Sequence, residues 1–398
     1  METTRVWECP FDHNEALEFD PLLAQLRDEA PVARISMPHG EGHAWLVTRY
    51  EDVRTVVTDR RFSRAAGIGR NLPRMTPEAI AQREAINLMD PPAHTRLRRL
   101  VAQGFTADQV ERMTPKIHTI VDGLIDEMAT KGPPVDFARE FSARLPLTTI
   151  CEVLAIPEED QPRIRKLAMA LMSTGSGEAT REAKAGLRAY FLDLSARRRE
   201  QPGDDLISTL ATARDGDELL DPTELAVMAM VLTITGHDTS TYQLSNILYT
   251  LLTHPEQLAL LRSRPDLLEQ ALEELLRYIP FRHGVGIARV ATEDVEIDGT
   301  VIRAGEVVHV SYLAANRDPR MFDRADELDI ERPVSLHMTF GHGTHYCIGA
   351  NLARAELRIA IETVLTRFPG LHLAVPAEQV PWHIGSIWRY PEELPIAW

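Results

Sequence analysis

Cysteine is scarce in this chain of 398 residues, which contains only Cys9, Cys151 and Cys347. Three scattered cysteines exclude a disulfide framework and favour a reducing compartment. The first residues form no apolar stretch of the kind that a secretory signal peptide needs. We therefore expect a cytoplasmic protein.

Long apolar runs and excess positive charge are also missing. No run of about 18 apolar residues occurs, so no membrane-spanning helix is expected. Lys and Arg number 43 against 59 Asp and Glu, a net charge of −16 that excludes general binding to nucleic acid or anionic membranes. Repeats, low-complexity segments and flexible linkers are absent too. The simplest interpretation is one mostly helical, monomeric domain over residues 1–398.

The segment around Cys347 carries the strongest functional pattern. A glycine-containing loop, residues 340–345, precedes this cysteine, and an apolar stripe with helical period follows it at Ala350, Ala353, Leu357, Ile361, Val364 and Phe368. Cys347 therefore lies at a helix N-terminus, where unpaired N–H groups and the helix dipole favour a thiolate. Small neighbours let a large flat ligand approach, and such a thiolate suits a haem iron.

Two other interpretations of this segment are open from the residues alone. Cys347 can be a buried structural cysteine in a glycine-rich turn, which is common for lone cysteines. His342, His345 and Cys347 can instead bind zinc, but zinc needs a further ligand or an open fourth position. No paired cysteine or histidine motif elsewhere supplies it, so haem is the favoured ligand.

The fixed positions of this segment resemble the haem-binding signature of the cytochrome P-450 family. They are Phe340, Gly341, Gly343, His345, Cys347 and Gly349. The resemblance implies that Cys347 is the metal ligand of haem b (heme b, iron protoporphyrin IX), with Phe340, Gly341, His345 and Gly349 as cofactor contacts. It also implies a mainly α fold with a small β region, in which haem lies between a long central helix and the cysteine loop.

Residues 221–253 predict that long helix. Asp221 to Glu224 form a capping box with proline at the first helical position, and the next ten residues are apolar on nearly all sides. Polar residues then interrupt it from Thr235 to Thr241. Polar groups and a glycine inside a buried helix cost stability, which is typical of functional sites, although an ordinary polar patch is the alternative.

This polar cluster resembles the oxygen-binding groove of the P-450 family. Asp238 and Thr239 match its acid–alcohol pair, which implies a catalytic role: Thr239 holds dioxygen and a water, and Asp238 relays protons. Gly236 lets the helix pass close to a flat group. Thr235 departs from the family pattern, because a small apolar residue is usual there, and it adds a hydroxyl near the sixth ligand position of haem.

His94 and Arg98 are four residues apart and share one helix face. Paired donors of this kind can bind the two propionates of haem, whereas a solvated basic face is the alternative. The segment resembles the family's Asp-Pro-Pro-x-His-Thr-Arg-x-Arg motif, which implies propionate binding by His94 and Arg98. Arg289 matches the third propionate-binding position.

Glu274 and Arg277 are three residues apart, and on their own they predict an exposed ion pair of little worth. The resemblance instead implies a structural triad with Arg332. By the same analogy, residues 281–287 and 383–388 line the substrate cavity, and the helices flanking residues 173–178 cover it.

The resemblance spans nearly the whole chain and implies a haem-thiolate monooxygenase. It activates O2 to hydroxylate or otherwise oxidise a small-molecule substrate, in the manner of bacterial members that tailor secondary metabolites. Electrons must come from outside, since no flavin- or iron–sulfur-binding segment is present. We expect ferredoxin and ferredoxin reductase as donors, docking on a basic patch of Arg96, Arg99, Arg354 and Arg358.

Two other functions stay open at this point. Oxidative C–C or C–N coupling of an aromatic natural product uses the same haem, and the polar, aromatic cavity segments allow it. A non-catalytic haem sensor or carrier is disfavoured because it has no need of Asp238 and Thr239. A peroxide-driven enzyme is disfavoured because that branch of the family lacks this acid–alcohol pair.

Overall fold

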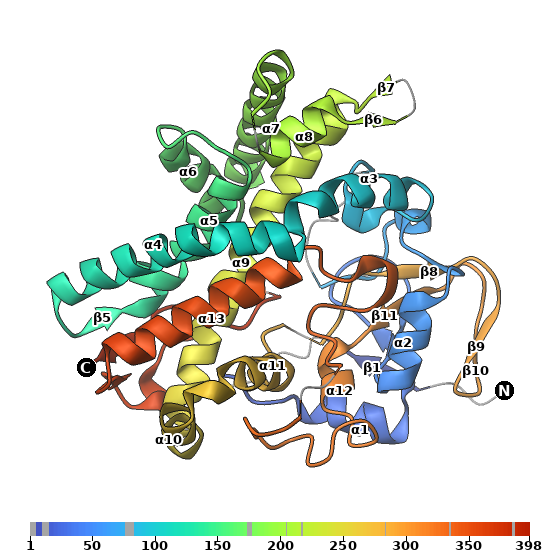
Figure 1. Cartoon of the computed structure of the whole chain (residues 1–398). Helices are drawn as coiled ribbons and strands as arrows, with labels where there is room; N and C mark the ends of the chain where they lie inside the picture. Colours follow the sequence, from blue (N-terminus) through green and yellow to red (C-terminus); the bar gives the residue numbers. More distant parts are fainter. Residues whose placement is uncertain are drawn as a thin grey trace. The chain divides into compact units, whose positions relative to one another are not determined.

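The chain divides into two units, each built from segments that are distant in the sequence. Figure 1 shows the computed structural model of the whole chain. Unit 1 comprises Met1–Arg83, Asn246–Cys347 and Pro381–Glu392, and unit 2 comprises Glu84–Ser245, Ile348–Val380 and Glu393–Trp398. The structure describes residues 5–9, 16–75, 83–172, 177–203, 205–215, 218–282, 284–333, 336–383 and 387–398. The loop predicted at residues 173–178 lies largely outside these ranges.

Unit 1 is built on a six-stranded sheet with the strand order β1-β2-β3-β11-β8-β4. The strands are β1 (Val6–Glu8), β2 (Val32–Ser36), β3 (Ala44–Val47), β11 (Val307–Val310), β8 (Arg289–Ala291) and β4 (Phe62–Ser63). The β1–β2 and β3–β11 pairs are parallel and the others antiparallel. Every residue of β3 and β11 is buried, His309 included, as expected of central strands in a largely apolar sequence.

Helices and a hairpin complete unit 1. The helices are α1 (Pro21–Glu29), α2 (Tyr50–Thr58), α10 (Pro255–Ser263), α11 (Leu268–Tyr278) and α12 (Tyr312–Asn316). Helix α1 begins at Pro21, where the Asp20 side chain caps it by accepting from the Leu22 N–H. A turn at Asp298-Gly299 joins β9 (Val295–Ile297) to β10 (Thr300–Ile302), and both turn residues have positive φ.

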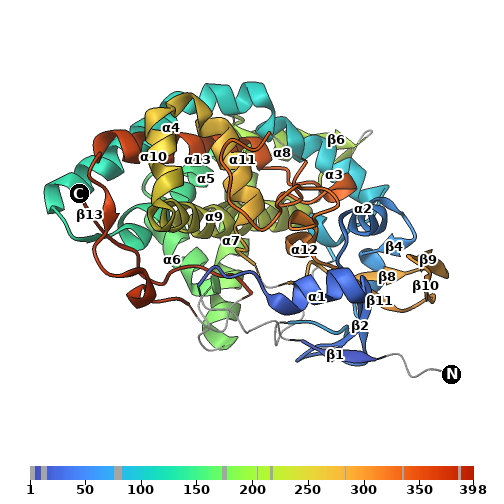
Figure 2. The same ribbon diagram turned by 90° about the horizontal axis from the view of Figure 1, so that it is seen from below.

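Unit 2 is mainly helical. Its helices are α3 (Ala93–Val101), α4 (Ala107–Lys131), α5 (Leu145–Val153), α6 (Gln161–Met172), α7 (Gly177–Glu200), α8 (Leu206–Thr212) and α13 (Ala350–Arg367). Helices α4 and α13 lie side by side in both views (Figure 2). The strands are β5 (Val135–Asp136), β12 (His372–Leu373) and β13 (Pro395–Ala397) in one small sheet, and β6 (Arg214–Asp215) and β7 (Glu218–Leu219) in a hairpin.

The long predicted helix is present as α9 (Pro222–Thr253), a single unbroken α-helix. Asp221 caps it by accepting from the backbone N–H groups of Thr223 and Glu224. Its apolar first turns, from Leu225 to Met230, are buried, so the expectation of a core helix is confirmed. Across the described residues, no helix combines the length and apolarity that crossing a membrane requires.

Candidate functional site

The loop before Cys347 holds this cysteine away from the core of unit 1. Gly341 and Gly343 have φ of 75° and 68°, a conformation that favours glycine, and a Cβ on Gly343 would meet the Val57 carbonyl oxygen at 3.0 Å. A 3-10 turn follows at Gly343–His345, and the Cys347 N–H donates to the Phe340 carbonyl at 2.8 Å. The two glycines therefore fold the loop into a tight turn that ends at Cys347.

Cys347 differs from the other cysteines of the chain. It is exposed, whereas Cys9 and Cys151 are buried, and burial raises the pKa of the Cys151 thiol to about 12. A buried structural role for Cys347 is therefore wrong. The zinc alternative also fails, because the described residues, which include His342 and His345, contain no group of three His, Cys, Asp or Glu side chains that could hold a metal.

Arg289, in β8, fits a haem propionate. Its side chain is buried, and its only hydrogen bond runs from Nη1 to the Ile287 carbonyl at 3.4 Å. Its Nη2 is buried without any hydrogen-bond partner among the described residues. Burying a cation this way is costly unless an anion binds it. An anionic group from a ligand would satisfy this guanidinium.

His94 and Arg98 lie one turn apart on α3 in unit 2. This helix begins directly after Pro91 and Pro92, as predicted. His94 is only 1% exposed and Arg98 is half-buried, so a fully solvated basic face is wrong for this pair. Arg99, which points elsewhere on the helix, is exposed. The donor pair is thus partly shielded from water within unit 2.

The hydroxyls of the α9 polar cluster bond back to the helix itself. Thr235 Oγ1 donates to the Val231 carbonyl at 2.8 Å, and Thr239 Oγ1 donates to the Thr235 carbonyl at 2.9 Å. Thr235 is exposed although most neighbours on this helix are buried. A Cβ on Gly236 would meet the Ile150 side chain at 3.0 Å, so the close approach that the structure shows for this glycine is to α5.

Asp238 forms a pair with His237 that the sequence did not predict. His237 Nδ1 lies 2.9 Å from Asp238 Oδ1, and His237 Nε2 lies 3.2 Å from the Ala143 carbonyl oxygen. A carbonyl only accepts, so Nε2 carries a hydrogen. The short Nδ1–Oδ1 contact then requires a second proton, held by one of the two partners. The pair, called the α9 dyad below, therefore stores a proton.

Burial dominates the electrostatics of Asp238. Its side chain is 5% exposed, and burial raises the pKa of this carboxyl, an effect that His237 partly opposes. His237 is the only titratable group among the described residues that acts on it noticeably. The dyad thus favours a protonated acid one residue before Thr239, which is an arrangement suited to proton transfer.

Glu356 is a second buried acid that sequence reasoning missed. It lies on α13, is 3% exposed, and bonds to the hydroxyls of Thr149 and Ser240. Burial raises its pKa to about 8. The Thr149 hydroxyl already donates to the Leu145 carbonyl at 3.0 Å, so it accepts from Glu356, which fits a protonated carboxyl. The spacing of Glu356 from Leu352 and Ala360 places it on an apolar face of the helix. This spacing is the sequence signal that could have revealed the buried acid.

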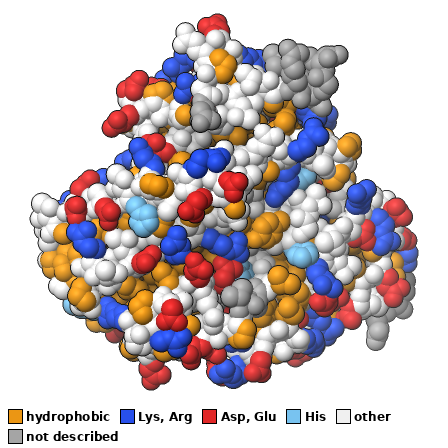
Figure 3. All heavy atoms as spheres, in the orientation of Figure 1, with side chains coloured by type: hydrophobic (Ala, Val, Ile, Leu, Met, Phe, Trp, Pro, Cys, Tyr) orange, Lys and Arg blue, Asp and Glu red, His pale blue; other side chains and the backbone are white. Residues whose placement is uncertain are grey.

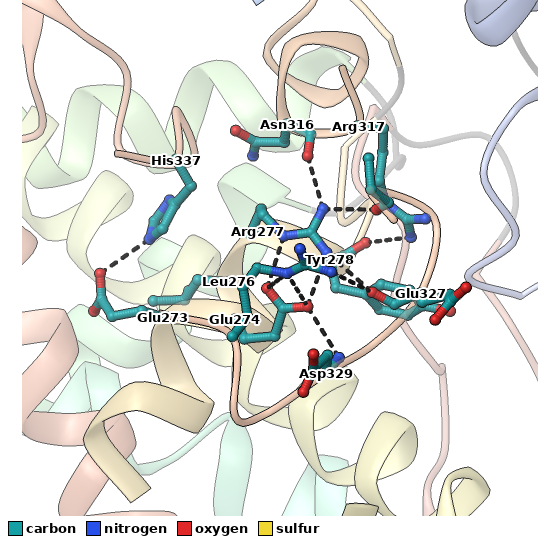
Figure 4. A network of polar contacts seen from close by, with 12 residues as sticks. Glu273, Glu274, Leu276, Arg277, Tyr278, Asn316, Arg317, Glu327, Asp329 and His337 are labelled. Carbon is teal, nitrogen blue, oxygen red and sulfur yellow. Dashed lines mark hydrogen bonds and ion pairs between the residues drawn. The ribbon is translucent and has the colours of Figure 1, made fainter. Parts of the chain in front are cut away.

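Glu274, Arg277 and Arg332 form a buried cluster in unit 1, called the Glu274 cluster below (Figure 4). The Glu274 carboxylate accepts from Arg277 at 2.7 and 2.8 Å and from Arg332 at 3.1 Å. The remaining Arg277 N–H groups donate to the carbonyls of Asn316, Ala325 and Glu327. The expectation of a structural triad is confirmed, and an exposed ion pair is wrong because these side chains have no access to water.

The predicted basic patch is partly neutralised. Arg96 donates to Glu224 at 2.5 Å, and Arg358 lies 3.6 Å from Glu362. Arg99 is exposed and Arg354 is half-buried. Basic and acidic side chains are also mixed over α4 and α13 on the face in Figure 3. Any docking surface here carries less positive charge than the count of arginines indicates.

Comparison with known proteins agrees with these features. The cytochrome P450 family model matches residues 261–379. Nocardicin C N-oxygenase of Nocardia uniformis subsp. tsuyamanensis is 45% identical over the full length of both chains. Biflaviolin synthase CYP158A1 of Streptomyces coelicolor is 42% identical, over 96% of this chain and 93% of its own.

Solved structures extend this agreement to the fold. A crystal structure of cytochrome P450mel 107F1, which has biaryl coupling reactivity, matches with a TM-score of 0.94 and 62% identity, over 99% of this chain and 100% of its own. The LnmA cytochrome P450 hydroxylase of the leinamycin pathway of Streptomyces atroolivaceus matches with a TM-score of 0.93 and 47% identity, over 98% and 100%. The predicted mainly α fold with a small β region is confirmed. The chain belongs to the cytochrome P450 family and is a haem-thiolate monooxygenase of the kind found in secondary-metabolite pathways.

Proposed function

We propose that Cys347 is the thiolate that binds haem b, with His94, Arg98 and Arg289 on the propionates. Phe340, Gly341, His345 and Gly349 shape the loop beside the haem, and Thr235 and Gly236 contact it from α9. Bound in this way, haem supplies reductive activation of O2 for oxidation of a small organic substrate. The exposed thiol of Cys347 and the unsatisfied Nη2 of Arg289 support this assignment.

The α9 dyad is the observation that carries a catalytic function. A sensor or carrier of haem needs no stored proton, yet Asp238 is buried beside His237 with a raised pKa. Thr239 follows directly, and because its own hydrogen goes to the Thr235 carbonyl, its oxygen is left to accept. In our proposal Asp238 delivers protons and Thr239 positions dioxygen and a water.

Replacing the acid tests this assignment. In Asp238→Asn, product formation is expected to fall by about 100-fold or more, as for loss of a general acid. O2 consumption should fall less, with hydrogen peroxide accounting for the difference. Thr239→Ala should also raise peroxide, whereas Thr253→Ala, a hydroxyl at the far end of the same helix, should not. Unchanged product per O2 in Asp238→Asn would contradict the proposal.

We also propose that reduced ferredoxin, supplied by its reductase, donates the electrons. Arg99 is the exposed cation of the predicted patch, and charge reversal at Arg99 and Arg354 should weaken ferredoxin binding and its salt dependence. The same reversal at Arg303, an exposed arginine of unit 1, is the control. If reversal at Arg303 weakened ferredoxin binding as much as reversal at Arg99 and Arg354, the proposed docking site would be excluded.

Oxidative coupling of an aromatic substrate is the second candidate reaction. The 62% identity to P450mel 107F1, with its biaryl coupling reactivity, and the likeness to a biflaviolin synthase favour it. Product mass separates the two reactions, because hydroxylation adds an oxygen and coupling joins two substrates with loss of hydrogens. A product containing one atom of labelled oxygen from O2 would exclude coupling for that substrate.

A further inference from the structure

Several buried arginines of unit 1 are matched by oxygen atoms. Arg277 and Arg332 bind Glu274, Arg317 donates to the Tyr278 carbonyl at 2.8 Å, and Arg389 donates to the Glu18 carbonyl at 2.6 Å. Arg282 has no such partner. This residue is half-buried, and among the described residues its side chain makes no hydrogen bond and no ion pair, while its Nε is buried and unsatisfied.

The surroundings of Arg282 make this isolation costly. Burial lowers the pKa of its guanidinium, and among the described residues only Tyr312 opposes this noticeably. The described titratable side chains nearby also include His309, whose pKa is lowered by burial and by Arg282 and Arg289, and Arg289 itself. A cation that has no carboxylate partner in the described part of the chain destabilises the free protein.

A flat aromatic surface lies directly beside this cation. The Arg282 Cζ atom is 5.1 Å from the centroid of the Trp388 ring, and Trp388 stacks on Phe281 with 5.5 Å between centroids and 15° between planes. The backbone is fixed as well. Arg282 and Trp388 pair in an isolated β-bridge, and the Arg389 N–H donates to the Phe281 carbonyl at 2.9 Å. The cation and the rings are thus held together without any ligand.

We infer that Arg282 and the Trp388–Phe281 stack form a recognition site for a planar aromatic substrate that carries an anionic oxygen, as a phenolate or carboxylate. The guanidinium binds the oxygen through charge-assisted hydrogen bonds, and the stacked rings contact the apolar face. This inference rests on the proposed function, since the assignment of both segments to the substrate cavity comes from the family. It favours acidic aromatic substrates over neutral macrolides or terpenes.

A matched pair of probes tests the site in the haem-loaded protein. The probes are 2-naphthoate and 2-naphthamide, which have nearly the same shape but differ in charge, and their binding is measured by equilibrium dialysis. A charge-assisted contact predicts about 10- to 100-fold tighter binding of the naphthoate. Arg282→Gln should reduce that ratio to near one and leave the naphthamide affinity within about twofold. Arg264→Gln, an exposed arginine far along the chain, should keep the wild-type ratio.

Stability supplies an independent readout. Because the Arg282 Nε is buried and no described residue supplies a counter-charge, Arg282→Met should raise the midpoint of thermal unfolding while it abolishes the preference for naphthoate. If Arg282→Gln and Arg282→Met both lowered the midpoint of thermal unfolding, Arg282 would be a structural residue and the inference would be overturned. So would equal binding of both probes to the wild-type protein, or an unchanged ratio in Arg282→Gln.

The two proposals fail in distinguishable ways. If the wild-type protein, reduced and exposed to carbon monoxide, lacks the spectrum of thiolate-bound haem, the proposed function fails. If that spectrum is normal in wild type and in Arg282→Gln, but the probe preference is absent or unchanged, only the substrate assignment fails.

Discussion

Unit 1 and unit 2 each contain a buried polar group, the Glu274 cluster and the α9 dyad. Both are shielded from water, but they differ in how many hydrogen bonds hold the buried charge. Glu274 accepts from two arginines and from the Asp329 N–H, and each terminal nitrogen of Arg277 finds a carbonyl or carboxylate oxygen. Asp238 has one partner among the described residues, His237, and burial raises its pKa.

The difference separates a structural role from a chemical one. A fully matched charge network gains nothing by taking up or losing a proton, so it fixes a scaffold. A buried acid with a single neighbour lies close to both protonation states, so it can exchange a proton. Buried charge alone therefore does not identify a functional site; these two groups differ in how many partners hold the charge.

The largest expected effect breaks the Glu274 cluster. Glu274→Ala leaves two buried arginines unmatched and should lower the free energy of unfolding by about 3–5 kcal/mol, whereas Asp238→Asn should change it by about 1 kcal/mol or less. Urea unfolding of both variants at one pH measures the contrast. Similar losses of stability in the two would show that the dyad is part of the scaffold as well.

A pH series on Glu356 gives the next largest effect. Its pKa is raised to about 8, so its neutral form stabilises the protein fully below pH ~4.5 and this contribution is lost as pH rises through 8. Glu356→Gln should match wild type near pH 5 and exceed its free energy of unfolding by on the order of 3 kcal/mol at pH 8. Parallel curves for the two proteins between pH 5 and 8 would exclude a buried neutral Glu356.

Removing the partner of Asp238 should have a smaller effect, on activity alone. His237 lowers the pKa of Asp238, so His237→Phe should raise this pKa further and weaken the acid. The falling limb of the pH–activity profile, along which Asp238 loses its proton, is then expected to move to higher pH, and the weaker acid should form product roughly several-fold more slowly below that limb. His254→Phe, at the end of the same helix, is the control. An unmoved profile in His237→Phe would mean that Asp238 works without the histidine.

The smallest effect belongs to an exposed ion pair. Arg264 and Asp266 are 2.8 Å apart, but their side chains are 50% and 64% exposed. Arg264→Ala should leave the free energy of unfolding almost unchanged. A loss of unfolding free energy comparable to that of Glu274→Ala would show that burial does not determine how much these ion pairs stabilise the protein.

How far the sequence could predict these features depends on whether a local pattern carries them. The steps of three and four residues placed Glu274 with Arg277 and His94 with Arg98 on helix faces, and the loop before Cys347 followed from its glycines. Their burial could not be read from spacing, because it is set by segments distant in the sequence. Arg277, for example, is covered by the carbonyls of Asn316, Ala325 and Glu327.

The same limit explains why His237 and Glu356 were missed and why the lack of a partner for Arg282 was not foreseen. His237 stands at the variable position of the oxygen-binding motif. Its Nε2 donates to the carbonyl of Ala143, about ninety residues earlier, and no local pattern predicts that contact. Glu356 looked like a charged residue on a helix, and its neutral form depends on Thr149 and Ser240. Arg282 was expected near the substrate, but the lack of a partner among the described residues is a property of the fold.

The central claim, that Cys347 holds haem as a thiolate, is tested most directly by the absorption spectrum of the reduced, haem-loaded protein under carbon monoxide. Wild type and Cys151→Ser should show the red-shifted Soret band of thiolate ligation, and Cys347→Ser should lose it together with turnover. A band that is absent from wild type, or that persists in Cys347→Ser, would contradict the account.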